Sequence, residues 1–296
     1  DWRAGLNGKL EILRGFNGFL SARYRDGHEA RGANDPALDP LRAPIQVEET
    51  NFSASLAKEF GRFRVTGAAA SDNFDFHDGT RASGANFDQD FRDETLLTLS
   101  ARVDLALSPS TALFASYANH DHQFDLGARD FTSRQALIGA GFDITHLVRG
   151  EIGVGYFWTD FDNPAQSNLS GGSLNARIDW FVTRLTTVNF HASRDIADSG
   201  IITSSSIENE TAGVRVDHEL RRNIILSASA DYQKQDYQGI DRQDEYSTFS
   251  LGADWLVNRW ATLGAHVTQE DRSSAGAARD RDYDRTRASI SLTLKR

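Results

Sequence analysis

The chain lacks cysteine entirely, and this absence excludes disulfide bonds, thiol nucleophiles and zinc–thiolate centres. It also lacks any stretch near the roughly 20 consecutive apolar residues that a membrane-spanning helix needs, so a helical membrane protein is excluded. No basic tract is present, and 32 basic against 42 acidic residues give a net charge of −10. We therefore expect no nucleic acid among the partners.

Low hydrophobicity alone would suggest a polar soluble protein, because apolar residues make up 39% and the mean hydropathy is −0.48. One class of membrane protein shares this composition. A transmembrane β-barrel carries apolar residues only at alternate positions of its strands, so its average hydropathy resembles that of a soluble protein. The order of the residues must decide between the two.

Alternation with a period of two dominates the chain. In 97–107 the odd positions hold Leu, Ala or Val, and the even positions include Thr98, Ser100, Arg102 and Asp104. In a β-strand these two sets point to opposite faces, one apolar and one polar. The same pattern recurs along the chain and predicts strands at about 1–12, 16–29, 47–59, 63–76, 91–107, 111–125, 130–146, 151–162, 170–183, 186–198, 205–220, 223–238, 243–257, 260–274 and 281–296.

Two kinds of connection alternate between these segments. Short polar joints such as Gly61-Arg62 and Asn258-Arg259 are followed by longer stretches rich in Asp and Gly, such as 27–47 and 77–90. Short turns at one end and long loops at the other are typical of an outer-membrane barrel, with the loops outside the cell. We expect a transmembrane antiparallel up-and-down β-barrel in the bacterial outer membrane.

A soluble all-β sandwich or propeller is the alternative. Several predicted strands run about 12–16 residues, whereas soluble strands usually have about 5–6, and a tilted strand crosses a membrane in about 9–11. Trp180, Trp255 and Trp260 lie near short joints, while Tyr156 and Tyr232 lie further along their strands. Two such groups match the aromatic girdles of a membrane protein, which favours the barrel.

A recurring unit of the chain resembles a known family. It consists of a strand with alternating Leu, Ala and Gly, a short joint, and a returning strand, as in 211–232 and 249–265. Over essentially its whole length the chain resembles the putative β-barrel porin 2 family of Gram-negative outer-membrane proteins. The resemblance implies a part in surface polysaccharide export, beside a periplasmic polysaccharide export protein.

The expected strand count exceeds the segments that can be read. The first segment enters a short joint before Phe16, so it runs from the loop side and at least one strand should precede it. Barrels of bacterial outer membranes have even strand counts, and the resemblance suggests about 18 strands, with about 16 as the alternative. We expect residues 1–296 to form one barrel domain that lacks N-terminal strands and ends in the periplasm.

Two groups of residues resemble metal ligands. His120 and His122 share one face of a strand and could chelate a metal, although a solvated polar rim explains them equally well. The segment 72–79 has the Asp spacing of a calcium loop but is not followed by the glutamate that such loops need. Divalent ions between its carboxylates and lipopolysaccharide phosphates remain an open alternative, and we predict no resident metal or cofactor.

The inward, polar face is the expected functional surface, with both signs of charge interleaved along it. Facing Arg and Asp side chains could bind sugar hydroxyl groups, or could pair across strands and stiffen the wall. The residues predicted to line the lumen are Arg23, Arg25, Arg64, Arg102, Asp104, Arg177, Asp179, Arg215, Asp217, Asp231, Asp254 and Arg287.

These observations predict a passive barrel and no enzyme. The leading function is a porin or conduit for surface polysaccharide, in contact with outer-membrane lipid and lipopolysaccharide. The alternative is a structural or anchoring barrel with a closed lumen and loops that bind a partner. A Gly-x-Ser-x-Gly elbow is missing, which leaves an outer-membrane hydrolase as a third and weaker reading.

Overall fold

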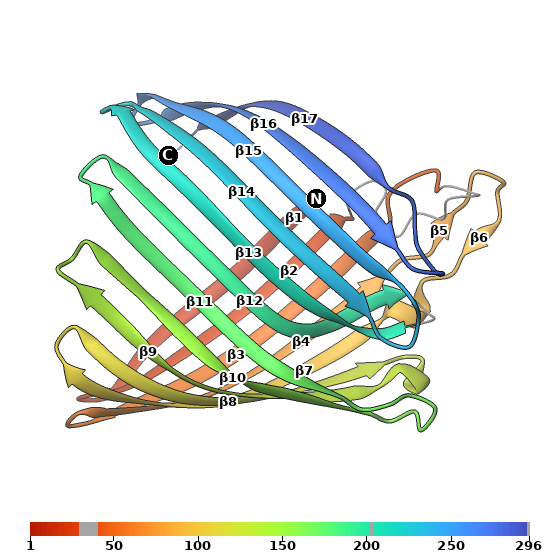
Figure 1. The fold of residues 1–296 in the computed structure, drawn as a ribbon, viewed down its shortest axis with the longest axis horizontal. Coiled ribbons are helices and arrows are strands. Elements are labelled where there is room, and N and C mark those ends of the chain that lie inside the picture. The colour runs from red at the N-terminus through yellow and green to blue at the C-terminus, as the bar shows by residue number, and fades with distance from the viewer. Residues whose placement is uncertain (30–40, 202–203, 295–296) are drawn as a thin grey trace. The chain divides into compact units, whose positions relative to one another are not determined.

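A computed structural model describes residues 1–29, 41–201 and 204–294 (Figure 1). Fifteen long strands pair in one antiparallel sheet in this part of the chain, and no helix there is long and apolar enough to cross a membrane. The long strands are β1 (Trp2–Leu13), β2 (Phe16–His28), β3 (Gln46–Phe60), β4 (Phe63–Phe76), β7 (Glu94–Ser108), β8 (Thr111–Phe124), β9 (Phe131–Ile144), β10 (Val148–Phe161), β11 (Leu169–Thr183), β12 (Thr186–Ile201), β13 (Ser204–Arg221), β14 (Ile224–Tyr237), β15 (Gln243–Asn258), β16 (Ala261–Ala275) and β17 (Tyr283–Leu294).

The longer connections contain short elements of their own. Strands β5 (Gly79–Thr80) and β6 (Asn86–Phe87) form a small hairpin between β4 and β7. Single 3-10 turns follow at η1 (Asp90–Arg92) and η2 (Gly127–Arg129). The alternation of residues predicts none of these elements, because each is too short to show a period.

Every predicted strand segment corresponds to one long strand, and the differences lie at the ends. β7 begins at Glu94 rather than at residue 91, because η1 precedes it. β9 ends at Ile144 rather than at residue 146, because Thr145 and His146 adopt positive φ angles of 53° and 57° in the turn. Residues other than glycine rarely adopt positive φ angles, and such angles do not fit a β-strand, so pairing stops there.

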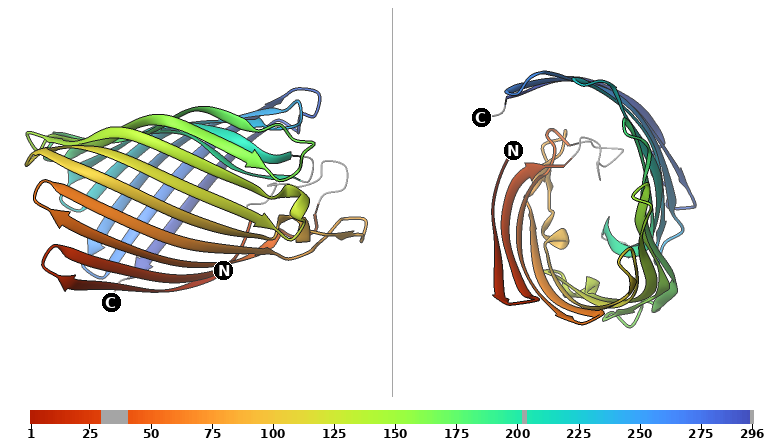
Figure 2. Two further views of the ribbon diagram at one scale, coloured as in Figure 1. Left: turned by 90° about the horizontal axis from the view of Figure 1, so that it is seen from below. Right: turned by 90° about the vertical axis from the view of Figure 1, so that its left-hand side faces the viewer.

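Two compact units make up the chain. The first comprises residues 1–138, 155–173 and 198–207, and within it β1, β2, β3, β4, β7 and β8 lie side by side in chain order (Figure 2). The second comprises residues 139–154, 174–197 and 208–296, and there β14 to β17 pair in chain order. In both units, strands that follow one another in the chain pair as antiparallel hairpins.

Tight turns alternate with longer loops between most of the strands, as predicted, but β12 ends at Ile201 and β13 begins at Ser204, so that loop-end connection is as short as a turn. Gly61, with a φ of 60°, and Arg62 connect β3 to β4, whereas residues 77–93 connect β4 to β7. A left-handed φ suits glycine because it has no Cβ, so the hairpin closes there without strain. We call the two ends of the strands the turn end and the loop end.

Solvent exposure alternates along each strand and divides the sheet into two faces. On β3, Phe52 and Leu56 are 59% and 51% exposed, while Ser53 and Ser55 between them are half-buried. The antiparallel register places Phe52 opposite Ala22 and Ser53 opposite Ser21, so each face keeps its character from strand to strand. Leu251 on β15 and Ile290 on β17 are 67% and 81% exposed. Lipid is the solvent that suits so extensive an apolar face.

The two faces predict opposite tolerance to charge. Leu99 on β7 is 49% exposed on the apolar face, and Leu99→Arg should cost about 2–4 kcal/mol of folding free energy in a bilayer. Ser100 lies on the polar face opposite Ala68 and Ala118, which leave room for a longer side chain, so Ser100→Arg should be tolerated. Urea titration of folding into lipid vesicles measures both variants, and equal destabilisation would contradict the assignment of faces.

Candidate functional site

All twelve residues predicted to line the lumen lie on the polar face of the sheet. The ladders place Arg64 opposite Asp104, Thr66 opposite Arg102, and Asp231 opposite Thr248. That this face surrounds a lumen remains a prediction. Within each unit, several of these side chains form ion pairs or hydrogen bonds with their neighbours, and these contacts neutralise part of the charge.

In the first unit, two of the predicted arginines hold carboxylates. The Arg25 guanidinium donates to Glu49 on the neighbouring strand at 2.5 Å. Arg102 binds Asp104, two residues along the same strand, at 2.8 Å and lies 4.0 Å from the centre of the Phe114 ring. Glu49 was not among the predicted residues, although its position opposite Arg25 follows from the strand register.

In the second unit, Asp179 and Asp217 are the centres of similar groups. Arg149 at the start of β10 donates to Asp179 at 3.0 Å, and Asn189 donates to the same carboxylate at 2.7 Å. Arg215 binds Asp217 on its own strand at 2.8 Å. Arg149 was missed because the sequence prediction placed it in the joint between strands 130–146 and 151–162, whereas the turn lies at 145–147 and β10 begins at Val148.

Histidines that the sequence did not single out contact two of the predicted aspartates. His191 on β12 reaches Asp231 on β14, with 3.5 Å between Nε2 and Oδ1, across the intervening strand β13. A Cβ at Gly213 of β13 would lie 2.3 Å from both side chains, so only glycine leaves this path open. His266 and Asp254 approach to 3.4 Å on adjacent strands.

His120 and His122 share the polar face of β8, as predicted. His122 is hydrogen-bonded to Glu94 through Nδ1 and stacks on Phe131 with 4.1 Å between ring centres, and it is buried. The interpretation as a solvated rim is therefore wrong for His122, because Phe131 and Glu94 cover it. His120 is hydrogen-bonded to Thr98 at 3.0 Å.

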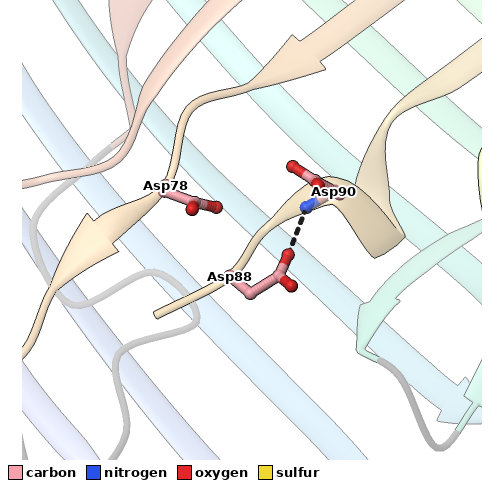
Figure 3. Close-up of side chains that lie close together, drawn as sticks. All are labelled: Asp78, Asp88 and Asp90. Atoms are coloured by element: carbon pink, nitrogen blue, oxygen red, sulfur yellow. Dashed lines mark hydrogen bonds between the residues drawn. The ribbon is translucent and has the colours of Figure 1, made fainter. Parts of the chain in front are cut away.

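An exposed group of three carboxylates lies in the connection between β4 and β7 (Figure 3). Oxygen atoms of Asp78, Asp88 and Asp90 lie within 4.8 Å of one another, the one such group of potential metal ligands that the described residues form. The hydrogen bond from Asn86 lowers the pKa of Asp78, while the charge of Asp88 raises the pKa of Asp90. Only Asp78 belongs to the calcium-like segment of the sequence; the hairpin β5–β6 brings up the other two.

Asp93 follows η1 in the same connection and is half-buried there. Burial raises the pKa of Asp93 to about 6, with further repulsion from Asp75 and Asp125. The backbone N–H of Phe76 donates to the Asp93 carboxylate at 2.7 Å and opposes the shift. Near neutral pH this carboxylate is ionised, and burial of its charge destabilises the folded loop.

The elevated pKa predicts how the loop responds to acid. Because the folded pKa exceeds the unfolded one, Asp93 stabilises the loop most below about pH 4, and this stabilisation is lost as the pH rises through about 6. Asp93→Asn keeps an acceptor for Phe76 and cannot ionise, so the loop should no longer loosen over that range. Hydrogen exchange of residues 77–93, measured below pH 4 and above pH 6 and corrected for intrinsic rates, tests this prediction. The same change of exchange with pH in the wild type and in Asp93→Asn would contradict it.

Long antiparallel strands, an exposed apolar face and a polar face rich in charged residues define an outer-membrane β-barrel protein, as the sequence predicts. More particularly, the chain belongs to the putative beta-barrel porin 2 family, whose family model matches residues 1–296. The predicted resemblance to that family is thus confirmed. No curated protein matches the chain.

Solved structures similar to the chain are outer-membrane receptors. One is the alcaligin outer membrane receptor FauA from Bordetella pertussis, with 11% identity over 99% of this chain and 57% of that chain and a TM-score of 0.52. Another is the siderophore receptor PirA from Acinetobacter baumannii, with 6% identity over 98% and 64% and a TM-score of 0.51. The chain therefore spans less than two thirds of the length of either receptor. At such low identity the likeness shows the fold alone.

Proposed function

We propose that the protein is a passive outer-membrane conduit for a surface polysaccharide, and not an enzyme. The observation that carries the proposal is a row of hydroxyl groups across the polar face of the second unit. Ser229 lies opposite Ser250, which lies opposite Thr268, and the last two are hydrogen-bonded at 3.1 Å. Such groups exchange hydrogen bonds with a sugar chain without holding it at one position.

Charge pairing along the polar face supports the same function. Arg102 with Asp104 and Arg215 with Asp217 neutralise each other over two residues of one strand. A wall of paired charges attracts neither anions nor cations strongly over a distance, which suits a hydroxyl-rich solute. The likeness to siderophore receptors concerns the fold and brings no substrate with it.

The proposal also includes an orientation and a partner. Long loops lie outside the cell among lipopolysaccharide, and the turn end and C-terminus lie in the periplasm. A periplasmic polysaccharide export protein delivers the polymer to the turn end. The resemblance to the family implies the partner, and the short turns at one end of the strands and the longer loops at the other imply the orientation.

A structural or anchoring role is the second candidate, and the hairpin formed by β12 and β13 favours it. Its end belongs to the first unit, where Ser199, Ser204, Ser206 and Ile207 are buried. Side chains packed in this way, rather than presented as an open loop, suit a structural role. In this case the loops would bind a partner and no solute would pass.

Electrical recording separates the two candidates. The purified full chain, inserted in planar lipid bilayers, should conduct ions in steps, and neutral oligosaccharides should interrupt the current more often as their length increases. An anchoring barrel should insert without conducting. If the protein inserts stably but no current steps are recorded, the proposed conduit function is wrong.

Thiol labelling tests the orientation, because the chain has no cysteine of its own. Ala82→Cys places the sole thiol of the chain in the exposed loop before β6, and Ser110→Cys places it in the exposed turn before β8. A membrane-impermeant maleimide added to intact cells should label the first variant and spare the second, whereas lysed cells should show both. The reverse pattern would invert the orientation.

A further inference from the structure

A basic hollow lies on the polar face of the first unit, at the turn end of β4 and β7. Its volume is about 460 Å³, within the range of small-molecule sites. Arg62 of the turn, Arg64 and Thr66 of β4, and Arg102 and Asp104 of β7 line it. The backbone hydrogen bond from Ala106 to the Arg62 carbonyl, at 2.8 Å, ties the turn to β7 and fixes where the hollow lies.

Positive charge exceeds negative charge in this hollow. Three guanidinium groups line it against the single carboxylate of Asp104, and Arg102 holds that carboxylate at 2.8 Å. Within residues 1–29, 41–201 and 204–294, no carboxylate forms an ion pair with Arg62 or Arg64. Glu59 lies opposite Arg64 on β3 but does not line the hollow.

A comparable group in the second unit shows the difference. At the turn end of β10 and β11, Arg149 and Asn189 both bind Asp179, so that arginine is satisfied within the protein. Arg62 and Arg64 keep their donors for a ligand. Guanidinium groups bind carboxylate, phosphate and sulfate oxygens through paired, charge-assisted hydrogen bonds.

We propose that this hollow is a binding site for an oxyanion group carried by the solute that the protein conducts. The proposal deepens the conduit function and rests on it for the route of the ligand, and it makes the preferred polymer an acidic one. Arg62 and Arg64 bind the anionic group, the Thr66 hydroxyl donates a hydrogen bond beside them, and Arg102 remains bound to Asp104. Successive acidic sugar units of a polymer would bind there one after another.

Binding is measured by calorimetry on the folded full chain in a neutral detergent, with trigalacturonate as the acidic probe and maltotriose as the neutral one. The double variant Arg62→Gln/Arg64→Gln keeps the size of both side chains and removes both charges. The control Arg222→Gln removes a charge from the exposed turn before β14, outside the hollow. Heat-modified migration on gels establishes that each variant is folded.

The wild type and Arg222→Gln should bind trigalacturonate more tightly than maltotriose, and the double variant should bind it about tenfold more weakly or worse. Inorganic phosphate should compete in the wild type. No preference for the acidic probe, or equal affinity in the double variant, would overturn the inference. Bilayer currents test the conduit separately: a conducting barrel without acid binding refutes only this site, and acid binding by a silent barrel refutes only the conduit.

Discussion

Backbone hydrogen bonding between neighbouring strands is the constraint on which the rest of this structure depends. Inside a lipid bilayer no water satisfies an exposed N–H or C=O group, so every residue that crosses must pair with an adjacent strand. Continuous ladders such as the one between β3 and β4 meet this requirement. They also fix the register, and the register assigns each side chain to the apolar or the polar face.

That constraint explains how much could be predicted from the sequence. Strands and faces follow from the alternation at positions such as Leu99 and Ser100, because one side chain meets lipid and the next does not. The loop end was less predictable, since Asp88 and Asp90 approach Asp78 only through the hairpin β5–β6. Arg62 was assigned only to a short joint and not to the polar face, because no alternation marks a face in a turn.

Arrangement on the strand, more than composition, determines the electrostatics of the polar face. Counted along the sequence, Arg and Asp are interleaved and no preference for one sign of ion is evident. In the structure, the pairs two residues apart on one strand cancel locally, as Arg215 and Asp217 do. Unequal charge remains at particular places, the acidic group of one loop and the basic hollow of one turn.

The contact of His191 with Asp231 has a mechanical consequence. Backbone hydrogen bonds connect each strand only to its immediate neighbours. Two neighbouring strands can therefore separate when the hydrogen bonds between them break one after another. This side-chain contact spans β13 and joins β12 directly to β14 over Gly213. A force that peels β14 from β13 must therefore break a second attachment, anchored one strand further away, and the wall of the second unit resists opening one seam at a time.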